Sequence, residues 1–400
     1  MLKNELAEKI GSSQTINTEL MALITHYINN PNEKKYCLDE TIFSSQIERN
    51  LIKDRYEYAG EKKFTFIDLF AGIGGFRIAM QKLGGKCVFS SEWDSAAQET
   101  YFANFGDVPF GDITRVETKN MIPNHFDILC AGFPCQPFSY AGQKKGFNDP
   151  TKGTLFFDVC EILKTHRPKA FFLENVKGII SHDNGNTIRI IREKLQNELG
   201  YTIYEGILNS LDFGLPQKRE RWYCVGFREN ESFKFPKGKK EIVTLRSIID
   251  INNQDPALKL PEFELNRIKY HFEHAEEIRV KHDNSKYAPN TKKGKYGVYS
   301  FQKPDGSLRF HVGDVAKTQI QEAFYSCLDT YASTIIANRT PKLWDIGRKL
   351  SILESKRLQG FPDDYLIPVS NAQGYKQLGN SVSIPVLQSI GVELLKTLGV

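Results

Sequence analysis

The stretch FDILCAGFPCQPFS, residues 126–139, indicates both the fold and the chemistry of this chain. Its first five residues form a short apolar run flanked by turn formers, which predicts a buried strand. Pro134 and Pro137 fix φ on either side of Cys135, so we expect its thiol in a rigid loop just past the strand. Reactive groups collect at that end of strands in open α/β sheets. By itself Cys135 would be interpreted as a packing residue, and its neighbours make it a candidate nucleophile.

Length and composition limit the classes of protein. The chain has 400 residues, of which 40% are hydrophobic, which favours one large α/β domain with a smaller one. It has no apolar run of about 18 residues and no signal peptide, so we expect a cytoplasmic protein without membrane spans. The seven cysteines are an odd number without a disulfide framework and suggest reduced thiols. No clustered Cys and His residues indicate a metal site.

A glycine-rich turn follows the apolar run FTFIDLF, which begins at residue 64. Gly72 and Gly74 would let the backbone approach a ligand as the chain enters a helix, whose first N–H groups are free. Glu92 stands twenty residues after Gly72 and suits a ribose diol. Trp93 could cover an adenine face, and Asp112 could accept from an exocyclic amine. A dinucleotide dehydrogenase would share this pattern, so a second signal is needed.

A second carboxylate and a basic run supply that signal. The strand-like run AFFLE ends at Glu174, and a parallel sheet would direct Glu174 and Cys135 toward one crevice. In QKRER, alternation along an extended chain places Gln217, Arg219 and Arg221 on one side. Such a run is commonly a solvated face, but beside a nucleophile and an acid it favours an anion clamp.

Several motifs in this order resemble those of the DNA cytosine-5 methyltransferases of bacterial restriction-modification systems. They are FIDLFAGIGGF, SEWD, GDIT, GFPCQPFS, GTLFF, FFLENVKGI, LPQKRERWYCVGF, RLQGFPDDY and YKQLGNSVSIPVL. The resemblance covers residues 64–230 and about 334–400. It implies a doubly wound, Rossmann-like α/β domain that binds S-adenosylmethionine, with a smaller irregular β-rich target-recognition domain.

The resemblance also implies roles for individual residues. Cys135 would add to C6 of a flipped-out cytosine, Glu174 would assist at N3, Arg221 would contact the O2 edge and Arg219 a phosphate or the loop. The residues implied for the methyl donor are Phe70, Gly72, Gly74, Glu92, Trp93, Asp112, Ile113, Pro134, Leu155, Asn380 and Ser381. The loop after Cys135 has the composition of a mobile lid, with Ser139 as a phosphate ligand, although an ordinary surface loop remains an alternative. Gln217 is also predicted to contact DNA.

Four segments are expected along the chain. Residues 1–62 form a helical N-terminal extension, 63–234 the catalytic and cofactor-binding domain, 235–333 the target-recognition domain, and 334–400 return to the catalytic domain. The extension is interpreted as a packing or linker segment, with a DNA-reading appendage as the alternative.

The recognition segment is basic. Residues 265–319 hold eleven Lys or Arg and six Asp or Glu, a surplus that equals the net charge of +5 of the whole chain. The turn Pro304-Asp305-Gly306 separates two strand-like runs, YGVYSF and SLRFHV. Lys292, Lys293 and Lys295 are predicted phosphate contacts, and Arg309 and Arg339 predicted base readers.

The expected partner is double-stranded DNA with a short recognition site, bound by a monomer. A cognate restriction endonuclease would be a functional rather than a physical partner. Methylation of a structured RNA such as tRNA is the alternative activity. A DNA-binding regulator acting through the N-terminal extension is the alternative of a different class.

Overall fold

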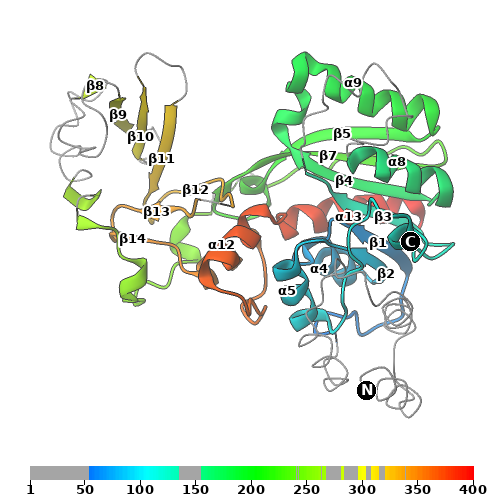
Figure 1. The fold of residues 1–400 in the computed structure, drawn as a ribbon, viewed down its shortest axis with the longest axis horizontal. Helices are drawn as coiled ribbons and strands as arrows, with labels where there is room; N and C mark the ends of the chain where they lie inside the picture. Colours follow the sequence, from blue (N-terminus) through cyan, green and yellow to red (C-terminus); the bar gives the residue numbers. More distant parts are fainter. Residues whose placement is uncertain are drawn as a thin grey trace, which may run out of the picture.

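The structure is a computed structural model. It describes residues 54–134, 155–239, 241, 243–262, 264–266, 325–337 and 339–400, and the backbone of residues 281–282, 296–302, 308–314 and 320–324. These residues form two six-stranded sheets and one two-stranded sheet (Figure 1). None of the helices in these ranges is both long and apolar enough to cross a membrane. The predicted helices of the extension lie outside the described residues, and its described part, residues 54–62, forms turns.

The main sheet has the order β2-β1-β3-β4-β7-β5. Its first four strands are parallel neighbours, whereas β7 runs antiparallel to β4 and β5. The strands are β1 (Phe64–Leu69), β2 (Gly85–Ser91), β3 (Ile128–Gly132), β4 (Ala170–Val176), β5 (Thr202–Asn209) and β7 (Glu220–Phe227). Just before Asp112 the chain makes one parallel bridge, between Ser91 and Phe110.

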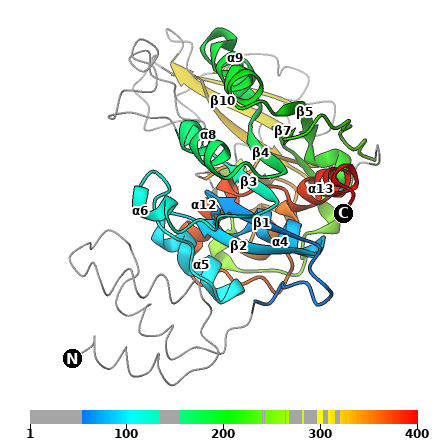
Figure 2. The ribbon, with the colours of Figure 1, turned by 90° about the vertical axis from the view of Figure 1, so that its right-hand side faces the viewer.

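Helices cover both faces of this sheet (Figure 2). Its central strands β1, β3 and β4 are accordingly almost entirely buried. In β1, Phe66 packs with the core under α4 and α13, whereas Ile67 packs with the core under α8 and α9. The helices are α4 (Gly75–Lys82), α5 (Ser95–Phe105), α6 (Val116–Lys119), α8 (Leu155–His166), α9 (Asn186–Arg192), α11 (Ile352–Gln359), α12 (Asn371–Asn380) and α13 (Ile384–Leu398). The shorter helical turns are η2 (Lys177–Ile180), η3 (His182–Gly185), η4 (Glu193–Glu198), η5 (Ser210–Phe213), η6 (Leu245–Ser247) and η7 (Pro256–Leu258).

The second sheet lies apart from the first (Figure 1). Its strands, in spatial order, are β14 (Arg348–Lys349), β13 (Lys342–Leu343), β11 (Ile320–Ser326), β10 (Leu308–Asp314), β9 (Tyr296–Gln302) and β8 (Lys281–His282). The antiparallel pairing of β9 with β10 confirms the two predicted strand-like runs, and the turn between them lies outside the described residues. Because β13 and β14 follow residue 333, this sheet extends past the expected segment boundary.

A two-stranded sheet joins the two parts of the molecule. In it β6 (Gln217–Lys218) pairs in parallel with β12 (Ala332–Ser333). Thr334 adds a hydrogen bond of 2.7 Å from its hydroxyl to the carbonyl of Lys218. The chain leaving the second sheet is thereby attached to the loop that precedes β7.

Candidate active site

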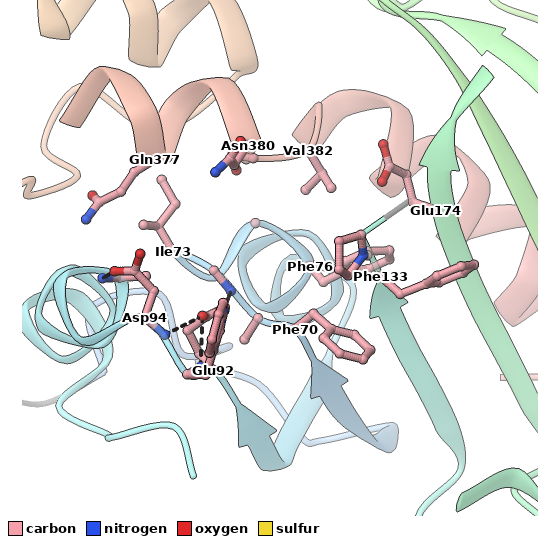
Figure 3. A pocket seen from close by; sticks show the side chains of 18 of the residues that line it. Phe70, Ile73, Phe76, Glu92, Asp94, Phe133, Glu174, Gln377, Asn380 and Val382 are labelled. Carbon is pink, nitrogen blue, oxygen red and sulfur yellow. Dashed lines mark hydrogen bonds between the residues drawn. The ribbon is translucent and has the colours of Figure 1, made fainter. Parts of the chain in front are cut away.

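A cavity of about 630 Å³ opens where β1, β2, β3 and β4 end (Figure 3). Segments far apart in sequence line this cavity. Its lining includes the glycine turn, residues 70–75, and residues 376–382 of the C-terminal part of the chain. All but one of the residues predicted for the methyl donor line this cavity, namely Phe70, Gly72, Glu92, Trp93, Asp112, Ile113, Pro134, Leu155, Asn380 and Ser381. Glu174, Arg219 and Arg221 line it too.

The exception is Gly74, which does not line the cavity. The glycine turn is left-handed at Phe70 (φ 56°), Gly72 (φ 54°) and Gly74 (φ 78°). A Cβ on Gly72 would meet no atom within 4 Å, so its backbone stays accessible to a ligand. A Cβ on Gly74 would lie 2.3 Å from the ring of Phe105. Gly74 is therefore required by its φ and by close packing on α5, and its cofactor contact stays a prediction.

Glu92 holds the glycine turn against the end of β2. One carboxylate oxygen accepts from the backbone N–H of Gly72 at 2.8 Å, and the other accepts from Trp93 at 2.9 Å and Asp94 at 2.8 Å. Burial raises the pKa of Glu92, and these hydrogen bonds oppose that shift. A carboxylate with four lone-pair sites can still accept from a bound hydroxyl on the cavity side.

The wall beside Glu92 carries one large exposed ring. The Trp93 side chain is 77% exposed, so its face is free to cover a planar group. Asp112 accepts from the N–H of Thr114 at 2.9 Å, which fixes its carboxylate at the cavity wall next to the buried Ile113. An apolar slot with one carboxylate at its edge fits an adenine and its amine.

Glu174 lies at another end of the cavity (Figure 3). Its Oε1 is 3.2 Å from Nε of Arg221, which enters from β7. Burial raises the pKa of Glu174, and the guanidinium groups of Arg221 and Arg219 oppose that shift. The neighbouring Asn175 donates from Nδ2 to the carbonyl of Phe133 at 2.8 Å, which fixes the chain just before Pro134.

Arg219 and Gln217 serve the architecture of the site. Arg219 donates to the carbonyls of Ile335 at 2.9 Å, Gly379 at 3.4 Å and Ser381. Gln217 is fully buried, accepts from the N–H of Ile335 at 2.9 Å and donates to the Leu358 carbonyl at 3.0 Å.

These contacts bear on two predictions. The Gln217 amide is fully buried and bonded to protein groups, and its contact with DNA stays a prediction. Arg219 donates to three carbonyls, whereas its buried Nε has no partner within the described residues, and its contact with a phosphate or the loop stays a prediction. Burial lowers the pKa of Arg219 to about 9.

Not all of the other predicted site residues fall within the described part of the chain. Cys135 and Ser139, and the lysines 292, 293 and 295, lie outside the described residues. Arg309 belongs to β10, of which the structure describes the backbone alone. Arg339 is exposed and forms a β-bridge with Ile336, a residue of the cavity wall.

The structure adds an ion pair that the sequence analysis did not single out. Lys376 of α12 lies 3.0 Å from Asp94, the N-cap of α5, and both line the cavity. Lys376 belongs to the motif YKQLGNSV, so its position in that motif was the available signal. Within the described ranges, no three His, Cys, Asp or Glu residues are grouped to hold a metal ion.

Comparison with known proteins defines the class. The sequence profile of the C-5 cytosine-specific DNA methylases matches residues 64–396. The chain is 47% identical over 343 residues to the type II methyltransferase M.HpaII of Haemophilus parainfluenzae, covering 84% of this chain and 91% of the relative. Its identity to M.HhaI of Haemophilus parahaemolyticus is 40%, with 82% and 93% covered. A crystal structure of S. pombe Dnmt2 methyltransferase shares the fold, with TM-score 0.58, 17% identity and coverage of 84% and 99%.

The chain therefore belongs to the C-5 cytosine-specific DNA methylase family, whose methyl donor is S-adenosylmethionine. It is a DNA (cytosine-5-)-methyltransferase of the kind found in type II restriction-modification systems.

Proposed function

We propose that this chain methylates one cytosine within a short double-stranded DNA sequence, with Glu174 and Arg221 holding the flipped-out base. The observation that carries this proposal is the buried Glu174–Arg221 pair at one end of a cavity whose other end suits a nucleoside. A stacked cytosine cannot reach such a cavity, so the base must leave the duplex.

In this proposal three residues act at different atoms of the cytosine. The Cys135 thiolate adds to C6, and the electrons of the C5–C6 double bond move toward C5, which then takes the methyl group. Glu174 assists by donating to N3, and its raised pKa favours the protonated form that can donate. Arg221 donates to the O2 edge. The C5 proton then leaves, the C5–C6 double bond re-forms and the thiolate is expelled.

The cavity fits S-adenosylmethionine as the donor. When bound, this group supplies an electrophilic methyl on a sulfonium. The open backbone at Gly72 leaves room for it, Glu92 would accept from the ribose hydroxyls, and Trp93 and Asp112 would bind the adenine. Asn380 is exposed to the cavity from the end of α12 and would contact the methionine part.

In this proposal target choice resides in the second sheet and its connections. Arg309 and Arg339 read bases, and the lysines 292, 293 and 295, with Ser139, contact phosphates. The enzyme acts as a monomer and protects DNA from a cognate endonuclease that need not touch it.

A covalent-trapping experiment tests the assignment. Duplex DNA containing 5-fluorocytosine should form a permanent adduct with the wild type in the presence of donor, because fluorine at C5 blocks elimination. Cys135→Ser should form none, whereas Cys327→Ser, which changes a half-buried cysteine outside the cavity, should trap DNA normally. An adduct on another cysteine, or full activity of Cys135→Ser, would contradict the proposal. Trapping on tRNA in place of DNA would favour the alternative substrate.

A further inference from the structure

The segment just before β1 packs against the back of the glycine turn. Asp54 and Tyr56, here called the N-terminal clasp, precede β1 by about ten residues and belong to no helix or strand. Both side chains are half-buried, and each makes a separate path of contacts toward the turn. Neither residue lines the cavity, so any effect on donor binding must pass through other groups.

The first path is ionic. Asp54 accepts from Arg77 Nη2 at 2.9 Å and from Gln81 Nε2 at 3.0 Å. Arg77 and Gln81 belong to α4, the helix that begins directly after the glycine turn. Arg77 also donates to Asp107 at 2.8 Å and to the Tyr101 hydroxyl at 3.0 Å. The Asp54 carboxylate thus completes the pairing of a buried guanidinium on this helix.

The second path is aromatic. The ring of Tyr56 stacks on that of Tyr365, with centroids 5.7 Å apart and an interplanar angle of 27°. Tyr365 is almost fully buried, and its hydroxyl donates to the carbonyl of Ile73, which lies inside the glycine turn and lines the cavity. Phe105, whose ring excludes any side chain at Gly74, packs edge-on against Tyr56 at 6.0 Å.

We propose that Asp54 and Tyr56 are positioning residues for the glycine turn, and that this clasp sets the affinity for the methyl donor. The turn carries strained left-handed backbone at Phe70 and has no side-chain cap at the start of α4. The contacts of Asp54 and Tyr56, on the side of the turn away from the cavity, therefore hold the glycine turn in the conformation that accepts a ligand. The inference rests on the proposed use of this cavity for S-adenosylmethionine.

Point variants of the full chain test the clasp by calorimetry with S-adenosylhomocysteine, the reaction product. Tyr56→Ala should weaken binding by about fivefold or more, as for a modest coupling between sites, and should raise the donor KM while kcat at saturating donor stays within about twofold. Tyr56→Phe keeps the ring and should bind like the wild type. Glu57→Ala is the matched control, since its exposed ion pair with Lys62 at 3.2 Å lies outside both paths. Asp54→Asn tests the ionic path with a milder change.

A second measurement uses the wild type alone, so it does not require any variant to fold. It depends on the thermodynamic linkage between ligand binding and the stability of the clasp. If the clasp shapes the turn, S-adenosylhomocysteine must in return stabilise the clasp and slow hydrogen exchange at residues 54–57. Wild type that fails to bind this ligand would refute the proposed donor site itself. Wild type that binds it, with unchanged exchange at residues 54–57 and equal affinity in Tyr56→Ala, would overturn the clasp alone.

Discussion

Glu174 Oε1 lies 3.2 Å from Arg221 Nε, and the two side chains are 10% and 12% exposed. The residues sit on neighbouring antiparallel strands, in the register that places Glu174 opposite Tyr223 and Val176 opposite Arg221. The Glu174 carboxylate is therefore held by a residue of the adjacent strand, β7.

Replacing Glu174 by Gln should lower the single-turnover rate of methyl transfer by at least about 10²-fold, because Gln can hydrogen-bond but cannot deliver a proton to N3. Affinity for the donor should scarcely change, since Glu174 lies away from Glu92 (Figure 3). Glu220→Gln is the control, because it alters a more exposed carboxylate on the same strand as Arg221. A normal rate in Glu174→Gln would exclude the acid role.

Arg219→Ala should lower the free energy of unfolding by at least about 2 kcal/mol, because it leaves buried carbonyls without donors. Urea unfolding followed by fluorescence measures this change. The adjacent Lys218→Ala changes an exposed side chain and should stay within about 0.5 kcal/mol of the wild type. Equal stability of the two variants would show that Arg219 does not tie these segments together.

Gly379→Ala should destabilise the junction between α12 and the segment returning from the second sheet. Its Cβ would lie 2.3 Å from the carbonyl carbon of Ile336 and 2.4 Å from the N atom of Ala337, so backbone must move. Such overpacking costs about 1–3 kcal/mol, and thermal unfolding should detect it. Gly178→Ala, whose Cβ would meet no atom within 4 Å, should unfold like the wild type.

Asp68→Asn should change the pH dependence of stability. Asp68 is fully buried in β1, and burial raises its pKa from 3.8 to about 8. Between these values the folded chain keeps a proton that the unfolded chain releases, so this group makes stability fall as pH rises. Asn does not titrate, and the variant should gain stability relative to the wild type from pH 5 to pH 8. Parallel urea-midpoint profiles over that range would contradict this.

The sequence predicted the central strands β1, β3 and β4 because they are buried on both faces and are therefore rich in apolar residues. Glu174 could be placed because the apolar run AFFL leads directly to it, and Glu92 because it directly follows the predicted strand that ends at Ser91. The burial of Gln217 could not be predicted, because alternation along QKRER specifies a side of the strand but not what covers it. The cover is α11 and the segment at Ile335, which come from more than 100 residues later.

Gly74 shows a related limit. A glycine in a ligand-binding loop can be required by the ligand or by side chains that pack behind the loop. The sequence shows a glycine in either case and does not distinguish the two causes. Only the position of Phe105, thirty-one residues further along, distinguishes the two. Tyr56 and Tyr365 were not predicted as partners, because nothing local links residues so far apart.

The cavity wall drawn from residues 376–382 also has a consequence for biosynthesis. The ribosome makes the glycine turn and Glu92 first, and more than 280 residues later it makes the wall that faces them. A nascent chain can therefore hold half of the site but cannot close it. The cavity is therefore closed only after α12 has been made and has docked on α5, where Lys376 pairs with Asp94.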